Sequence, residues 1–379
     1  MKIAFLSTDN REQLSQYDKE RPFFGPAPAA LLDGFAMLGD EVEIHVISCT
    51  KRKMEAPEKL AENIWFHQPV VPKIGWGRTA FLGCAMAVRD ILGEIRPDLV
   101  HAQGTERDCG VAMMLAPKGP RLLTIHGHMA RIAEITHAKF PSYYWMASRL
   151  EAMAVRKADG VVALSNYTRE RLKDHCRKSW VLPNALDTSF FGVNSPATGN
   201  IALCVGAVTP WKRQLELIQA LDECPAGRRP RVVFLGSLGN DSYGQQVKAA
   251  IDQRDWCDYQ GFADRRTLRE WLSKAALLIL PSIEDNCPMV ILEAMAAGVP
   301  VAGSHIGGIP DLVEEGVTGT LFDPQIPTDM AGKIGELMGA PELRAACASL
   351  SAARALERYS PEVIARRHLE IYREVISNN

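Results

Sequence analysis

LPSIEDNCPMVILEAMAAGVPV, residues Leu280–Val301, shows the structural pattern of the chain most plainly. The stretch begins at the end of an apolar strand, and an acidic loop follows. Pro288 stands where a helix is expected to begin, and Gly298 stands where that helix is expected to end. Val299–Val301 then resumes an apolar strand. A strand, a helix and a second strand in this order predict a parallel sheet built from crossover units.

The same alternation extends in both directions from this stretch. The expected strands are Lys2–Ser7, Val42–Ser48, Leu99–Ala102, Arg121–Ile125, Gly160–Leu164, Trp180–Leu182, Asn200–Val205, Arg231–Leu235 and Ala276–Leu280. The expected helices are Ala27–Leu38, Phe81–Ile95, Gln214–Leu221, Tyr243–Arg254, Leu268–Lys274, Val290–Ala297 and Pro361–Ser377. The pattern restarts after Gly192–Gly199, a segment rich in turn formers that is typical of a linker. We therefore predict an α/β fold with two doubly wound, Rossmann-like domains, 1–194 and 195–358, facing across a cleft.

Composition narrows the class of protein further. Hydrophobic residues make up 47% and charged residues 23% of the 379 positions, which excludes disorder, collagen and a coiled coil. The net charge of −2 argues against a nucleic-acid partner, because dedicated binders are usually basic. Nine scattered cysteines without a C-x-x-C pair argue against a disulfide framework or a structural zinc site. The opening apolar run, Ile3–Leu6, is too short for a signal peptide, so we expect a cytoplasmic protein.

The loop before Pro288 has the chemistry of an anion site. The first amides of a helix lack partners within the helix and carry the positive end of its dipole, which suits a diphosphate. Asp285 in the loop and Glu293 in the helix could each accept hydrogen bonds from neutral hydroxyl groups. Two carboxylates that flank a phosphate site suit a sugar nucleotide. The alternative for each acid alone is an ordinary role, with Glu293 paired on a helix surface and Asp285 in a solvated turn.

The segment resembles the E-x7-E motif of retaining glycosyltransferases of the GT-B fold, especially family 4. Asp285 and Glu293 are separated by seven residues, and Asp285 stands where glutamate is usual. The form Asp-Asn-x-Pro is similar to that of bacterial polysaccharide transferases. The resemblance implies that Asp285 contacts the donor sugar and that Glu293 binds the ribose hydroxyls. It adds the residues of the turn to the donor site: Asn286, Cys287, Pro288 and Met289.

Other stretches match the family in the same order along the chain. The segment that contains Gly206 and Lys212 resembles the first loop of the nucleotide-binding domain, with Ala207 where arginine is frequent. The resemblance makes Lys212 the cation expected on the departing diphosphate, and the neighbouring Arg213 could compensate for Ala207. The alternative for Lys212 is an ordinary surface lysine.

Further matches are expected to be mainly structural. Gly307-Gly308 resembles the family's Gly-Gly turn, and Gly316–Pro324 resembles its next hairpin-like element. Asn184–Asp187 resembles the segment that closes the first domain. The last helix, within residues 359–379, resembles the one that crosses back to the first domain.

The first domain is expected to hold the acceptor side of the site. Thr124-Ile125-His126 resembles the family's T-x-H segment, in which the histidine lies beside the donor sugar. Gly25 follows the first strand, where the family often has a Gly-Gly pair that touches donor phosphate and acceptor. His126 and His128 lack a third ligand at metal-binding spacing, and the chain has no Asp-x-Asp triplet. We therefore expect no cofactor and no catalytic metal.

Basic residues gather in one part of the first domain. They are Arg149, Arg156, Lys157, Arg169, Arg171, Lys173, Arg177 and Lys178. This set favours contact with anionic lipid headgroups, and hence a peripheral position at the inner face of the membrane. A solvated helix face is an equally good interpretation.

The resemblance implies transfer of a sugar from a nucleoside-diphosphate sugar to an acceptor hydroxyl, with retention of anomeric configuration. The acceptor is expected to be a glycan or lipid-linked glycan in cell-surface polysaccharide synthesis. Alternatives are a nucleotide-sugar epimerase of the same architecture and a two-domain ligand-binding protein. A nicotinamide dehydrogenase is disfavoured, because no G-x-G-x-x-G follows a first strand.

Overall fold

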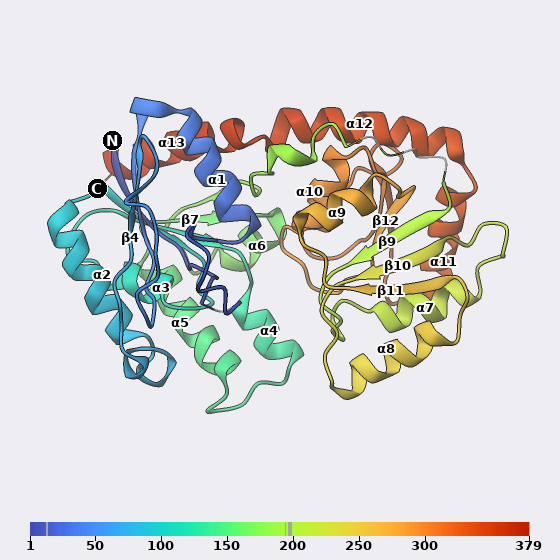
Figure 1. Ribbon diagram of the computed structural model, residues 1–379, viewed down its shortest axis with the longest axis horizontal. Coiled ribbons are helices and arrows are strands. Elements are labelled where there is room, and N and C mark those ends of the chain that lie inside the picture. The colour runs from blue at the N-terminus through green and yellow to red at the C-terminus, as the bar shows by residue number, and fades with distance from the viewer. Residues whose placement is uncertain (13, 194, 196–198, 379) are drawn as a thin grey trace. The chain divides into compact units, whose positions relative to one another are not determined.

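A computed structural model of the chain describes residues 1–12, 14–193, 195 and 199–378. The chain forms two compact units, each with a mainly parallel sheet and helices on both of its faces (Figure 1). Unit 1 comprises Met1–Asp187 and Ser360–Asn379, and unit 2 comprises Thr188–Tyr359. The boundaries expected from the sequence, 194/195 and 358/359, differ from these by a few residues. The linker expected at 192–199 lies partly outside the described residues, at 194 and 196–198.

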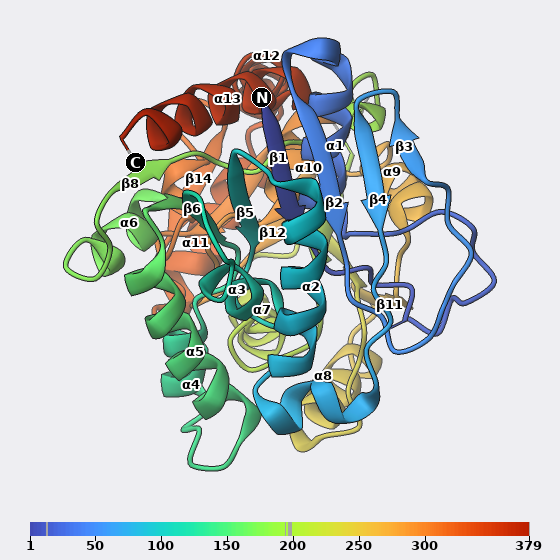
Figure 2. The same ribbon diagram turned by 90° about the vertical axis from the view of Figure 1, so that its left-hand side faces the viewer.

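The sheet of unit 1 has the doubly wound topology. Its strands are β1 (Lys2–Leu6), β2 (Glu43–Ile47), β3 (Lys59–Ala61), β4 (Ile64–His67), β5 (Leu99–Gln103), β6 (Arg121–Ile125), β7 (Gly160–Ala163) and β8 (Ser179–Val181). They lie in the order β3-β4-β2-β1-β5-β6-β7-β8, and β3 pairs antiparallel with β4 at the edge (Figure 2). The direction of winding reverses between β1 and β5. Ligands of such sheets bind beyond the carboxyl ends of the strands at this point.

Helices cover both faces of the unit 1 sheet. One face carries α1 (Pro26–Met37) and α13 (Pro361–Ser377), and the other carries α2 (Leu82–Ile95), α3 (Cys109–Met114) and α5 (Tyr143–Lys157). The helices α4 (Met129–Ile135) and α6 (Asn166–Leu172) follow β6 and β7. The last helix therefore packs on unit 1, where the fully buried Tyr372 stacks on Phe35 with ring centroids 5.9 Å apart. Ser360 and Pro361 stand at the expected cap and first helical positions, although the Ser360 hydroxyl forms no capping bond within the described structure.

The sheet of unit 2 repeats the same topology. Its strands are β9 (Ile201–Val205), β10 (Arg231–Leu235), β11 (Cys257–Gly261), β12 (Leu277–Leu280), β13 (Val301–Ser304) and β14 (Gly319–Phe322). They pair in parallel in the order β11-β10-β9-β12-β13-β14. The winding reverses between β9 and β12, so the loops after these two strands frame the expected ligand crevice of this unit.

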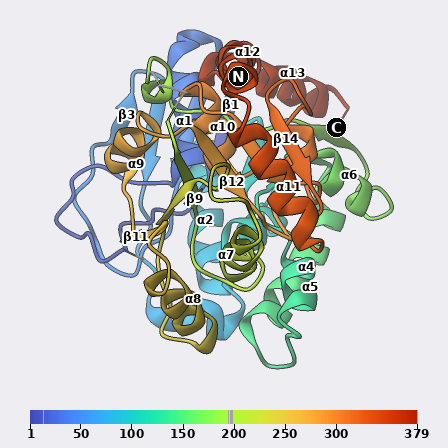
Figure 3. The ribbon, with the colours of Figure 1, turned by 90° about the vertical axis from the view of Figure 1, so that its right-hand side faces the viewer.

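Helices also cover both faces of the unit 2 sheet. One face carries α7 (Gln214–Asp222), α8 (Ser242–Asp252) and α11 (Pro327–Met338), whose apolar side chains share one core with β9 and β10. Figure 3 shows α7 and α11 side by side. The other face carries α9 (Arg265–Leu272), α10 (Met289–Ala296) and α12 (Pro341–Tyr359) (Figure 1).

One expectation about the fold is wrong. Gly316–Pro324 is not a hairpin, because a tight turn at Gly316 leads into β14, which pairs in parallel with β13. The sequence also gave no prediction of β3, β4 and β11. In the part of the chain that the structure describes, none of the helices combines the length and apolar character needed to cross a bilayer.

Candidate active site

Three loops of unit 2 are tied together at the carboxyl end of its sheet. The Ile283 amide donates to the Trp211 carbonyl at 2.8 Å, which joins the β12 loop to the β9 loop. The Gly308 amide donates to the Asp285 carbonyl, also at 2.8 Å, which joins the β13 loop to the β12 loop. Backbone hydrogen bonds therefore hold together the three loops that carry predicted site residues, at the point where the winding of the sheet reverses.

Lys212 and Asp285 meet across the first of these junctions. Lys212 Nζ lies 2.5 Å from Asp285 Oδ2, and the two side chains are 20% and 15% exposed. Gly206 adopts a φ of +150°, and a Cβ there would lie 3.9 Å from Lys212 Cε, so the lysine stem runs beside the glycine. The predicted cation and the predicted sugar-contacting acid thus form one ion pair.

Arg213 is directed elsewhere. It occupies the N-cap position of α7 with a φ of +56°, and its Nη1 lies 3.6 Å from Glu216 Oε1 on the same helix. Lys212, rather than Arg213, therefore supplies the positive charge beside Asp285.

The start of α10 has the expected form. Pro288 is its N-cap residue and Met289 its first helical residue, and no side chain of the described residues caps it. Asn286 and Cys287 are buried just before it. The Ile291 amide donates to the Pro288 carbonyl at 3.0 Å, whereas the Met289 and Val290 amides, the first two of the helix, have no acceptor within it. The loop between Asp285 and Met289 is therefore suited to receive an anion.

Glu293 lies within α10 and is 4% exposed. The rest of this helix is apolar, so the carboxylate needs a charged partner to offset its desolvation. Arg265, the first residue of α9, provides one: its Nη1 donates to Glu293 Oε1 at 3.1 Å. The sequence did not single out Arg265, because an arginine at a helix start has the pattern of a surface residue.

The Gly-Gly turn has a geometric role. Gly307 has a φ of +66°, and a Cβ there would lie 2.3 Å from the Asp285 carbonyl oxygen. Only glycine lets the β13 loop approach the β12 loop this closely.

Gly307→Ala is expected to lower the melting temperature and to displace Asp285, because the new methyl group meets backbone and the left-handed conformation adds about 1–2 kcal/mol. Gly316→Ala is the matched control, since Gly316 has a φ of +72° and no atom of the described residues lies within 4 Å of a Cβ there. Calorimetry and turnover assays should show a larger loss of stability at Gly307 and a loss of activity there alone. Equal effects at both positions would show that the close approach is unimportant.

His126 lines a pocket of about 250 Å³ within unit 1, where the winding of that sheet reverses. The lining residues are Ser7, Thr8, Asn10, Phe24, Pro28, Gln103, Glu106, Arg107, Cys109 and His126. His126 Nε2 lies 2.9 Å from Gln103 Oε1, which can only accept, so this ring nitrogen carries the proton. Burial lowers the pKa of His126, which favours the neutral ring at pH 7.

The contacts of His126 continue into the core of unit 1. Gln103 Nε2 donates to His101 Nε2 at 3.0 Å, and His101 Nδ1 lies 2.7 Å from the Tyr372 hydroxyl of α13. The last helix therefore anchors a chain of hydrogen bonds that ends at the pocket. Gly25, the N-cap residue of α1 with a φ of +83°, follows Phe24 of the same pocket.

His128 has a different neighbour. Its Nδ1 lies 3.5 Å from Glu151 Oε1. Glu151 is buried on α5 and accepts from the Met129 and Ala130 amides, both at 3.1 Å, and from the Thr105 hydroxyl at 2.8 Å. It thereby caps α4. Its spacing of four residues from Ala147 and from Val155 places it on the apolar face of α5, which is the signal in the sequence for a buried acid.

Glu151 should make the stability of unit 1 depend on pH. Burial raises its pKa from 4.5 to about 7, so the protonated form is favoured in the folded state. The contribution of protonated Glu151 to the free energy of unfolding is complete below pH 4.5 and is lost as the pH rises through 7. The free energy of unfolding changes by about 3 kcal/mol over this range. Relative to Glu151→Gln, the melting temperature of the parent protein should therefore fall between pH 5 and pH 8. Glu134→Gln, at an exposed position, is the control, and a constant difference for Glu151→Gln would contradict the expectation.

Several of the basic residues that gather between Arg149 and Lys178 are paired with acids. Lys173 lies 2.7 Å from Glu170, and Arg177 lies 2.8 Å from Asp159. Lys178 forms an ion pair with Glu374 of α13. These contacts weaken the interpretation of the whole segment as a lipid-headgroup surface.

One cluster of the described residues has metal-ligand chemistry. Cys49, Cys84 and Asp108 are buried in unit 1 with one potential ligand atom each within 4.8 Å of the others. The Cys49 thiol donates to the Cys84 carbonyl and the Cys84 thiol to the Gly75 carbonyl, both at 3.7 Å. Each thiol thus has a hydrogen-bond acceptor within the core of unit 1.

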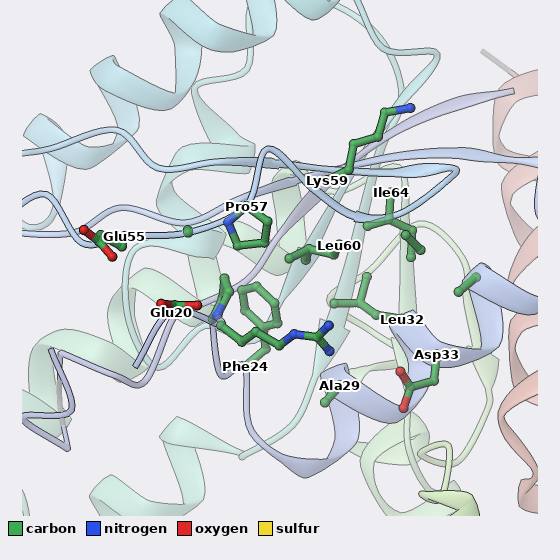
Figure 4. Close-up of a pocket in the computed structure, with 15 residues that line it drawn as sticks. Glu20, Phe24, Ala29, Leu32, Asp33, Glu55, Pro57, Lys59, Leu60 and Ile64 are labelled. Atoms are coloured by element: carbon green, nitrogen blue, oxygen red, sulfur yellow. The ribbon is translucent and has the colours of Figure 1, made fainter. Parts of the chain in front are cut away.

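A hollow of about 550 Å³ lies elsewhere in unit 1, between α1 and the β3–β4 edge (Figure 4). Phe24, Leu32 and Leu60 line it together with charged side chains such as Glu20 and Lys59. None of the residues that line this hollow is a predicted site residue.

Two family models match the chain. The model of the glycosyl transferases group 1 matches residues 187–353, and that of the Glycosyltransferase Family 4 matches residues 29–190. An alpha-maltose-1-phosphate synthase of Mycobacterium tuberculosis is 27% identical over 285 residues, which are 68% of this chain and 73% of that protein.

Solved structures share the fold. A sucrose-phosphate synthase of Thermosynechococcus elongatus has a TM-score of 0.80 at 17% identity, with full coverage of both chains. HepE of Anabaena in complex with UDP-glucose has a TM-score of 0.70 at 21% identity, covering 99% of this chain and 100% of that one.

Proposed function

Because the chain belongs to the glycosyltransferases of group 1 and family 4 and has their GT-B fold, we propose that it transfers a sugar from a nucleoside-diphosphate sugar to an acceptor hydroxyl with retention of configuration. The observation that carries this proposal is the grouping of Lys212, Asp285 and Glu293 around the start of α10.

The donor is assigned to unit 2. The diphosphate would lie against the amides that begin α10, with Lys212 on its oxygens. Glu293 would accept hydrogen bonds from the ribose hydroxyls, and Asp285 would accept from a hydroxyl of the sugar. The complex of HepE with UDP-glucose supports a nucleotide-sugar donor as the ligand class.

The chemistry needs few protein groups. The bond between the anomeric carbon and the diphosphate oxygen breaks, the acceptor oxygen bonds to that carbon on the same face, and the acceptor proton passes to the leaving diphosphate. Lys212 and the α10 amides stabilise the negative charge that develops on the diphosphate. The chain's own cation and amides take this role, so we propose a metal-independent reaction without a cofactor.

The acceptor is assigned to unit 1, where the resemblance makes His126 a catalytic residue beside the donor sugar and Gly25 a contact of donor phosphate and acceptor; His126 lines a pocket there. The Asp-Asn-x-Pro loop favours a glycan or lipid-linked glycan of cell-surface polysaccharide synthesis. We propose a cytoplasmic enzyme with peripheral membrane contact through unit 1. The basic residues without an acid partner among the described residues, which are Arg149, Arg156, Lys157 and Arg169, would make this contact.

A panel of nucleotide sugars tests the proposal. The full-length protein should melt at a higher temperature with UDP-, GDP- or ADP-sugars, and one of them should release nucleoside diphosphate when an acceptor glycan is added. Stabilisation by NAD but by no nucleotide sugar would contradict transferase activity. Conversion of the donor to an epimer without any acceptor would favour the epimerase instead.

A further inference from the structure

Arg265 occupies an electrostatically unfavourable position. It is the first residue of α9, whose first turn contains no acidic residue, and the positive end of the helix dipole repels a cation there. Asp264 caps the same end, accepting from the Thr267 amide at 2.7 Å. A residue whose charge is unfavourable for its own helix is expected to make a favourable contact elsewhere in the molecule. For Arg265, the contacts of its guanidinium group identify that purpose.

The guanidinium group of Arg265 joins two parts of unit 2. Its Nη1 donates to Glu293 Oε1 at 3.1 Å, and its central carbon lies 4.8 Å from the centre of the Phe190 ring. Phe190 is fully buried and belongs to the short helix Thr188–Phe190. This helix directly follows Asp187, where the first stretch of unit 1 ends.

Arg269, one turn later on α9, contacts the same segment and, among the described residues, makes no bond to Glu293. It lies 5.8 Å from the Phe190 ring centre, and its Nη1 donates to Ser189 Oγ at 2.8 Å. The two arginines therefore share the aromatic ring, and only Arg265 extends the contact to the carboxylate. This difference makes Arg269 a matched control.

We propose that Arg265 is a positioning residue that holds the Glu293 carboxylate in the orientation needed to bind the ribose, and that links this acid to the connecting segment Thr188–Phe190. The inference rests on the proposed function, because it takes Glu293 as the ribose-binding acid. A buried carboxylate that must accept from two neighbouring hydroxyls needs both its charge and a fixed orientation. A planar guanidinium group held over a buried ring stabilises the carboxylate charge and fixes the orientation of the carboxylate. A lysine would also stabilise the charge, but it lacks the planar group that packs on the ring.

The test measures how strongly binding depends on the ribose hydroxyls. Calorimetric titration would compare the nucleoside diphosphate that binds, among UDP, GDP and ADP, with its 2′,3′-dideoxy analogue. In the parent protein we expect the analogue to bind at least about 100-fold more weakly, because it lacks two hydrogen bonds to a charged group. The ratio of the two dissociation constants, analogue over nucleoside diphosphate, should fall to about threefold or less in Arg265→Lys and Arg265→Ala. In Arg269→Ala this ratio should equal that of the parent protein. Arg265→Lys retains the charge and serves if the alanine variant does not fold.

The two ideas can fail separately. If Glu293→Gln removes the ratio but both Arg265 variants keep it, Arg265 does not position the acid and the proposed function stands. If Glu293→Gln itself keeps the parent ratio, the ribose assignment fails and the inference falls with it.

Discussion

Lys212→Ala is expected to lower turnover by about 100- to 1,000-fold, with a change in donor affinity of less than tenfold. The lysine should matter most when the diphosphate leaves and its charge grows, an effect typical of a preorganised charge at a departing oxyanion. The same ammonium group lies 2.5 Å from Asp285 Oδ2, so this carboxylate fixes the position of the charge. Steady-state kinetics combined with calorimetric titration of the donor would measure both quantities.

Control variants separate two effects of Lys212→Ala, the loss of the positive charge that stabilises the diphosphate and the loss of the ion pair with Asp285. Lys248→Ala should leave turnover unchanged, because Lys248 pairs with Asp252 on the exposed side of α8. Lys212→Arg keeps a positive charge next to Asp285, so it should retain more turnover than Lys212→Ala. Equal losses in turnover and in donor affinity for Lys212→Ala would contradict a role in leaving-group departure.

Glu293→Ala is expected to weaken nucleotide binding by at least about 100-fold. Two hydrogen bonds to a charged group are lost, each contributing about 1.5–3 kcal/mol, and Arg265 loses its carboxylate partner. Calorimetric titration with the preferred nucleoside diphosphate gives the affinity directly. Circular dichroism should first establish that the variant is folded.

Glu357→Ala provides the comparison, because this glutamate is 69% exposed and pairs with Arg354 one turn away on α12. Its nucleotide affinity should equal that of the parent protein. An unchanged affinity in Glu293→Ala would remove the ribose role from this residue.

The fold was predictable wherever apolar residues recur at a clear period. The strands around Leu280 and Leu203 are buried on both faces, and their uninterrupted apolar runs identify them as parallel core strands. The edge strand β11, with the sequence CDYQG, is only partly buried and carries no such run. The short β3 and β4 are too brief for a period to emerge.

The composition of the site was partly predictable, but its contacts were not. The residue types of the loop Asp285–Met289 suggested an anion site from local helix chemistry alone. Lys212 and Asp285 are 73 residues apart, and only the folded sheet brings β9 beside β12. Arg265 carries no local signal of its bond to Glu293, because that bond depends on the packing of α9 near α10.

The most direct measurement is a crystal structure of the full-length protein with the nucleoside diphosphate that the donor panel identifies. We predict that the diphosphate lies against the turn Asn286–Met289, with Lys212 Nζ on its oxygens and Glu293 within hydrogen-bond distance of the ribose. A nucleotide bound at another place, with this turn empty, would contradict the assignment of the donor site.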